Sequence, residues 1–149
     1  MVKEILDANV LIRFLRDDHP EHSRKSRALI AQAEAGEIRL VLLASVVTEA
    51  IFVLTSVYGC SRREVVESLL PFLHHGGIEC SEADTVADAL HRFRSKRVDF
   101  MDCYLAAEAK ARGIPVVSFD RDFRKFDDIE WRQPGDQVDP FRHRASPKR

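Results

Sequence analysis

The chain opens with VKEILDANVLIRFLR (residues 2–16), and this stretch decides the fold class. Residues Val2–Leu6 have the length and apolar content of a short strand. After Asp7, apolar side chains recur at helical spacing, namely Val10, Leu11, Phe14 and Leu15. A strand that leads through an acidic residue directly into a helix is typical of the start of an α/β domain.

The same alternation continues along the chain. Helices are predicted over residues 23–35, 46–57 after a cap at Ser45, 62–73 after a capping box at Ser61–Glu64, 81–97 and 100–112. Strands are predicted over residues 39–43, 78–80 and 114–119, with a last edge strand at 129–131. The helix after Ser45 is apolar at almost every position, which indicates burial on most sides. Together these elements predict a three-layer α/β/α sandwich with a central, mainly parallel sheet.

Length and composition predict one globular domain. The 149 residues are 45% hydrophobic and 32% charged, which suits a single core of ordinary size. We expect this domain to span residues 1–138 and a basic tail to occupy residues 139–149. No apolar run approaches the ~20 residues of a membrane span. The 3 cysteines, without a CxxC pattern, argue against a disulfide framework. We therefore expect a cytoplasmic protein with no membrane segment.

Four acidic residues fall where strands lead into helices. In open parallel sheets this edge is where ligands bind. The four acids are Asp7, Glu49, Asp102 and Asp120. Each alone has a structural explanation, because the helix dipole favours an acid in the first turn by ~0.3–1 kcal/mol. Four carboxylates at one edge would repel one another unless a cation compensates them, and carboxylate oxygens are ligands for Mg²⁺ or Mn²⁺. The pattern therefore predicts a divalent cation site.

The segments around these acids read LDANVLI (residues 6–12), VVTE (46–49), DFMDCYLAA (99–107) and VSFD (117–120). In order, spacing and strand–helix context they resemble the four signature segments of PIN-domain nucleases, over residues 2–131. Within that superfamily the chain most resembles VapC-type toxins in size. The resemblance implies a PIN-like α/β/α fold and a metal-dependent endoribonuclease that cleaves RNA with metal-activated water. It also implies Mg²⁺ or Mn²⁺ as cofactor, a small VapB-like antitoxin as partner, and a homodimer.

The resemblance assigns roles residue by residue. The catalytic and metal-binding acids would be Asp7, Glu49, Asp102 and Asp120. Supporting polar roles would fall to Asn9 and Ser118. Asp99, three residues before Asp102, has two interpretations: it caps the helix from residue 100 or supports the metal ligands without touching the metal, or it binds the metal directly.

Basic residues beside the predicted site could contact RNA phosphates. The residues we expect in this role are Arg13, Arg97 and Arg121, although a solvated surface explains them equally well. The net charge of −1 excludes a strongly basic coat but allows a local basic patch. The six histidines show no pairing suited to acid–base catalysis, so surface or capping roles are expected for them.

Other functions fit the sequence less well. A haloacid dehalogenase-like phosphohydrolase needs two Asp separated by one residue, and this chain has Asn9 in the second place. A receiver domain needs paired acids after its first strand, and these are absent here. A non-toxin PIN-domain nuclease that processes RNA, or a non-catalytic RNA- or protein-binding domain of the same fold, remains an alternative. Metal-dependent RNA cleavage would separate these possibilities.

Overall fold

The computed structural model describes residues 1–136. It divides into two compact units, one from Met1 to Ala87 and one from Asp88 onward, and each is described by itself. The basic tail predicted at residues 139–149 lies outside the described residues.

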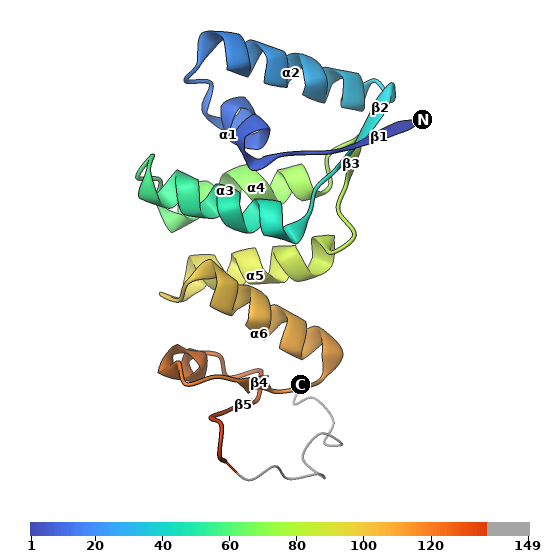
Figure 1. Ribbon diagram of the computed structural model, residues 1–149. Coiled ribbons are helices and arrows are strands. Elements are labelled where there is room, and N and C mark those ends of the chain that lie inside the picture. The colour runs from blue at the N-terminus through green and yellow to red at the C-terminus, as the bar shows by residue number, and fades with distance from the viewer. Residues whose placement is uncertain (137–149) are drawn as a thin grey trace. The chain divides into compact units, whose positions relative to one another are not determined.

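The first unit alternates strands and helices as predicted. Its elements are β1 (Val2–Ile5), α1 (Ala8–Arg16), α2 (Pro20–Glu34), β2 (Ile38–Val41), α3 (Ala44–Ser56), α4 (Arg62–Leu73) and β3 (Ile78–Glu79). The strands form a parallel sheet in the order β1-β2-β3, with Val2 opposite Ile38 and Leu40 opposite Ile78 (Figure 1). Helix α1 packs against α2 and α3. The predicted parallel pairing is therefore confirmed.

Local signals set where these helices begin. The hydroxyl of Ser61 accepts a hydrogen bond from the backbone N–H of Glu64 at 3.1 Å, so the predicted cap of α4 is confirmed. Helix α2 begins at Pro20, three residues before the predicted start at Ser23. His19 takes the cap position, and its Nδ1 accepts the N–H of His22 at 3.1 Å. Pro20 then suits the first helical position, where no backbone donor is needed.

Helix α3 differs from its prediction in two ways. It begins at Ala44 without a side-chain cap, so Ser45 lies inside the first turn and is not the cap. The helix is also not buried on most sides, because Phe52 is 67% exposed and Val57, just after the helix, is 72% exposed. Its buried face is carried by Ala44, Val47, Ala50, Ile51 and Leu54.

Gly77 is needed where β3 approaches α2. Its φ angle is +84°, which side chains other than glycine rarely adopt, and a Cβ there would lie 2.2 Å from the backbone oxygen of Ala33. Elsewhere in the first unit the buried core is mainly apolar, with the two buried serines Ser23 and Ser26, and includes Leu6, Leu11, Ile30, Leu40, Val47, Val66 and Leu69.

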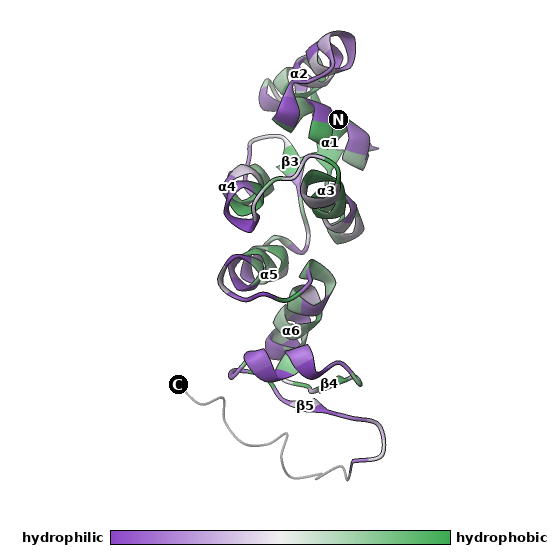
Figure 2. Ribbon diagram, turned by 90° about the vertical axis from the view of Figure 1, so that its left-hand side faces the viewer, coloured by the Kyte–Doolittle hydropathy of each residue, from purple (hydrophilic) through white to green (hydrophobic). Residues whose placement is uncertain are grey.

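Helix α5 (Ala83–Ser95) runs from the first unit into the second. Figure 2 shows hydrophilic residues along one of its sides and hydrophobic residues along the other. Val86, Ala89 and Leu90 are fully buried, whereas His91 and Arg94 are exposed. This division is the one expected of an amphipathic helix.

The second unit continues with α6 (Phe100–Arg112), β4 (Val116–Val117), the short 3₁₀ helix η1 (Arg121–Lys125) and β5 (Trp131–Arg132). Helix α6 has the predicted bounds and ends at Gly113, whose φ of +66° allows the left-handed stop. Strands β4 and β5 pair in parallel, with Val116 opposite Trp131. The last predicted strand therefore exists, shifted to residues 131–132. None of the helices in residues 1–136 is long and apolar enough to cross a membrane.

Candidate active site

Asp7 lies at the junction of β1 and α1, as predicted. It is the N-cap of α1, and its Oδ2 accepts the backbone N–H of Asn9 at 3.1 Å. Both side chains are exposed, so the carboxylate keeps free oxygen lone pairs for a further ligand. This contact comes from the backbone of Asn9, and the supporting role of its side chain stays a prediction.

Glu49 also belongs to the first unit and is exposed. Because α3 begins at Ala44, Glu49 falls in the second turn of the helix. The sequence predicts it in the first turn, so this part of the prediction is wrong. The helix dipole acts mainly on the first turn, so it does not account for an acid at this position. The interaction of a first-turn acid with the helix dipole therefore does not explain Glu49, although the sequence suggested that it could.

The other two predicted acids meet in the second unit. Asp102 lies in the first turn of α6, and Asp120 caps η1, three residues after the end of β4, which is shorter than the strand predicted over residues 114–119. The charge and the carboxyl group of Asp120 both act on the pKa of Asp102, so the two side chains are neighbours. Two negative charges close together repel each other, and a bound cation would relieve that repulsion.

Ser118 and Asp122 hold Asp120 in place. The backbone N–H of Asp120 donates to Ser118 Oγ at 2.9 Å, and the N–H of Asp122 donates to Asp120 Oδ1 at 2.8 Å. The carbonyl of Ser118 accepts the indole N–H of Trp131 at 2.9 Å, which ties this turn to β5. Ser118 thus helps to fix the turn that carries Asp120, and its supporting role at the site stays a prediction.

Asp99 occupies the N-cap position of α6 but makes no capping hydrogen bond with its side chain. The capping interpretation is therefore wrong for its carboxyl group. The charge of Asp99 instead acts on Asp102, one turn further along. Its roles as a direct metal ligand and as a group that supports the ligands both stay predictions.

This cluster changes the acidity of Asp102. The pKa of Asp102 rises from its ordinary 3.8 to about 6, first because the side chain is partly buried and then because of the charge of Asp120 and the hydrogen bond with it. The charges of Asp99 and Asp122 raise it further. A carboxylate cluster without enough counter-charge is the donor set that a divalent cation neutralises.

The second unit therefore offers oxygen donors that fit a hard divalent cation. Within residues 1–136, however, no three potential ligand side chains are already arranged as a metal site. Asp7 and Glu49 belong to the first unit, and Asp102 and Asp120 belong to the second. The convergence of all four acids at one metal remains a prediction.

The predicted RNA-binding arginines differ in their surroundings. Arg13 is engaged within the first unit, where it pairs with Asp18 at 3.0 Å and donates to the hydroxyl of Tyr58 at 3.2 Å. Arg97 and Arg121 are exposed in the second unit, and no ion pair holds them among the described residues. Arg97 lies two residues before Asp99, and Arg121 directly follows Asp120. Because no ion pair holds these two side chains in the described part of the chain, they suit phosphate contacts better than Arg13 does.

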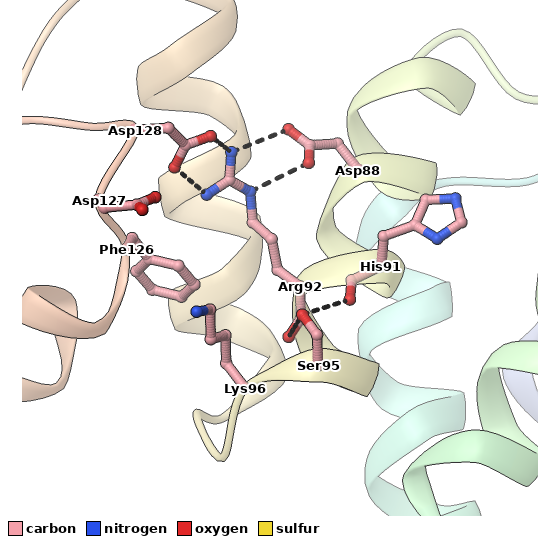
Figure 3. Close-up of a pocket in the computed structure, with 8 residues that line it drawn as sticks. All are labelled: Asp88, His91, Arg92, Ser95, Lys96, Phe126, Asp127 and Asp128. Carbon is pink, nitrogen blue, oxygen red and sulfur yellow. Dashed lines mark hydrogen bonds and ion pairs between the residues drawn. The ribbon is translucent and has the colours of Figure 1, made fainter.

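A hollow of about 240 Å³ lies elsewhere in the second unit, around Arg92 (Figure 3). Arg92 is only 8% exposed and forms hydrogen bonds with Asp88 and with both oxygens of Asp128, at 2.6 and 2.8 Å. Its guanidinium also lies 5.4 Å from the ring centre of Phe126. Lys110 adds a third cation contact to Asp128 at 3.0 Å. The central polar groups of this hollow therefore bind one another, which indicates a structural clamp.

The clamp predicts an acid-sensitive contribution to stability. Its cations hold the pKa of Asp128 well below the usual range, chiefly through the hydrogen bond from Arg92. A lowered folded-state pKa stabilises the protein above the unfolded value near 3.9, and this stabilisation is lost as the pH falls below it. Asp128→Asn should lower the free energy of unfolding by about 1–2 kcal/mol at pH 7 and by less at pH 3.

Chemical denaturation at both pH values checks this prediction. Asp127→Asn is the matched control, because Asp127 is the exposed neighbour and has no ion pair among the described residues. Equal stability of the Asp128→Asn and Asp127→Asn proteins at pH 7 would contradict the clamp.

Sequence reasoning missed the Arg92–Asp128 clamp, and also Lys125, which contacts Asp122 and the carbonyl of Arg97. The spacing of Asp88 and Arg92 is a helical i,i+4 pair and could have signalled the first half of the clamp. The contact between Arg92 and Asp128 spans 36 positions and leaves no periodic trace. The contact of Lys125 with a backbone carbonyl leaves none either.

Comparison with known proteins identifies relatives over most of the chain. The family model described as the PIN domain matches residues 5–129. A protein named VapC ribonuclease from Aquifex aeolicus (strain VF5) is 25% identical over 123 residues, which is 82% of this chain and 90% of that protein. The family match includes the positions of all four predicted acids.

Proposed function

The chain belongs to the PIN domain family, and on that premise we propose that it is a metal-dependent endoribonuclease that acts as the toxin of a toxin–antitoxin pair. Its alternating helices and parallel strands agree with the α/β sandwich predicted from the sequence. Similarity to a protein named VapC ribonuclease supports the activity and the toxin class. The observation that carries the proposal is the placement of Asp102 in the first turn of α6 and of Asp120 at the cap of η1, near enough for Asp120 to raise the pKa of Asp102.

The metal-binding residues in this proposal are Asp7, Glu49, Asp102 and Asp120, with Asp99 as a further candidate. Their carboxylate oxygens suit Mg²⁺ or Mn²⁺, and which ion serves is part of the proposal. When bound, such a cation supplies the activation of a water molecule and the stabilisation of charge on the phosphate. The acids hold and orient the cation. Asp7 and Asp120 are the two acids that cap helices, and the hydrogen bonds of Asn9 and Ser118 fix the backbone around them. No nucleophilic side chain is required.

RNA is the proposed substrate, and Arg97 and Arg121 are proposed to contact its phosphates. Both guanidinium groups are exposed; Arg97 lies two residues before Asp99, and Arg121 directly follows Asp120. An anionic polymer next to a carboxylate cluster needs such cations, because the acids alone would repel it. Arg13 is a weaker candidate, because Asp18 and Tyr58 already bind it.

The proposed partner is a small VapB-like antitoxin. Phe52 and Val57 give the first unit exposed apolar surface on and just after α3, which an amphipathic partner helix could cover. A basic side chain of the partner could pair with the carboxylates in place of the metal. Assembly as a homodimer and location in the cytoplasm are further parts of the proposal.

The direct test is cleavage of single-stranded RNA by the purified chain with Mn²⁺. Because water and not the RNA 2′-hydroxyl would attack the phosphorus, the fragments should carry 5′-phosphate and 3′-hydroxyl ends. End analysis with an exonuclease that requires a 5′-phosphate reads out the result. Fragments with 5′-hydroxyl ends would contradict the proposed chemistry.

A further inference from the structure

Lys125 joins the two segments that carry the acidic cluster of the second unit. Its ammonium donates to the backbone carbonyl of Arg97 at 3.1 Å and pairs with Asp122 Oδ1 at 3.2 Å. Arg97 lies in the loop just before Asp99 and α6. Asp122 lies in η1 and donates its backbone N–H to Asp120. One side chain thus connects the loop that leads to Asp102 with the turn that carries Asp120.

Apolar packing fixes both segments around this contact. Phe123 and Phe126, on either side of Lys125 in the chain, are 1% and 4% exposed, and their ring centres lie 6.2 Å apart. Val98 and Phe100 anchor the other segment in the core. Buried apolar residues hold each segment in place, while Lys125 is a polar contact from one segment to the other.

The contact is too exposed to be explained by stability. The Lys125 and Asp122 side chains are each 46% exposed, and ion pairs at this exposure contribute about 0–1 kcal/mol. The folded unit does not depend on the contact, but the spacing of two carboxyl groups can depend on it strongly. Residues that orient metal ligands typically change metal affinity by ~10- to 100-fold when they are replaced.

We propose that Lys125 is a positioning residue, which holds η1 against the loop before α6 and so sets the spacing of Asp120 and Asp102 for a divalent cation. This inference rests on the proposed function. It assigns Lys125 no contact with the cation or with RNA.

The direction in which Mn²⁺ affinity changes when Lys125 is replaced separates the positioning role from a simple effect of its charge. Lys125 is a cation near a cation site, so its charge alone opposes metal binding. If charge were its only influence, Lys125→Met would bind Mn²⁺ more tightly. A positioning role predicts the opposite, namely weaker binding after the like charge is removed.

Calorimetric titration of the full chain with Mn²⁺ is the test, with four proteins compared. Lys125→Met should raise the Kd roughly tenfold, within the range for residues that orient ligands. Lys125→Arg keeps the charge and a donor for the Arg97 carbonyl, and its Kd should stay within about twofold of the unchanged protein. The matched control is Lys110→Met, which also removes a lysine–carboxylate pair, with Asp128 at 3.0 Å, but this pair contacts neither the loop before α6 nor η1.

Each outcome bears on one claim. If the unchanged chain binds no Mn²⁺, the proposed function fails. If the unchanged chain binds Mn²⁺ and Lys125→Met binds it equally well or more tightly, only the positioning role is overturned. If Lys125→Arg or Lys110→Met weakens binding as much as Lys125→Met, the effect is not specific to the Lys125 contacts and the inference is also overturned. Melting temperatures of the four proteins identify any loss that follows from unfolding.

Discussion

Asp102→Asn should abolish RNA cleavage and at the same time stabilise the metal-free protein. Activity should fall by roughly 10³-fold or more, because several kcal/mol of transition-state stabilisation depend on a ligand charge that Asn lacks. Stability should rise because Asn removes a carboxylate that its neighbours disfavour. Opposite changes in activity and stability distinguish a metal ligand from a structural acid.

The stability gain should depend on pH in a defined window. In the folded protein the pKa of Asp102 is about 6, above its ordinary value of 3.8. Ionisation of Asp102 therefore costs folding free energy as the pH rises from about 4 to about 6, and the full cost applies above that range. One pKa unit corresponds to ~1.4 kcal/mol. Because Asp102 is only partly buried, we expect a gain of about 1–2 kcal/mol at pH 7 and none below pH 4.

Denaturant unfolding in chelator at pH 7 and pH 4 measures this gain. Asp127→Asn serves as control, because it makes the same change at an exposed position in the same unit. A loss of stability for Asp102→Asn at both pH values would show that Asp102 is mainly structural.

Asp7→Asn should also lower the rate of RNA cleavage by roughly 10³-fold or more, while the fold stays intact. Asp7 caps α1 through its bond to the N–H of Asn9, and Asn caps helices about as well as Asp does. Asp7→Asn therefore removes a ligand charge and keeps the cap. Asp7→Ala removes both and should lose a further ~0.5–2 kcal/mol of stability.

Ser61→Ala provides the matched control for the cap. Ser61 caps α4 with a side-chain bond of the same length, 3.1 Å to the N–H of Glu64, and no catalytic role is proposed for it. It should lose a similar amount of stability and keep its activity. Near-normal turnover by Asp7→Asn, with an unchanged circular dichroism spectrum, would contradict the role of Asp7.

The sequence predicted elements well where local signals define them. Helix α6 has the predicted bounds because Gly113 allows the left-handed stop, and α4 begins at the predicted cap Ser61. Helix α2 began earlier than predicted, because His19 is an unusual cap. The cap predicted at Ser45 failed because α3 begins before it, with no side chain bonded to its first turn.

The candidate site was predictable where its residues sit in motifs next to strands and helix starts. Asp7, Asp102 and Asp120 all lie at such junctions in the structure. What the sequence could not show is how these side chains are held. The influence of Asp120 on the pKa of Asp102 and the contact of Lys125 with the Arg97 carbonyl join positions far apart in the chain, with no periodic pattern to reveal them.

The central claim, that this chain cleaves RNA with a divalent cation held by these acids, is tested most directly by metal removal and return. The purified chain is treated with chelator and dialysed, and cleavage of a single-stranded RNA is followed without metal and then with added Mn²⁺ or Mg²⁺. The account predicts no cleavage without metal, recovery after addition, and no recovery in Asp102→Asn at any metal concentration. Cleavage that continues in chelator, or equal recovery in Asp102→Asn, would contradict it.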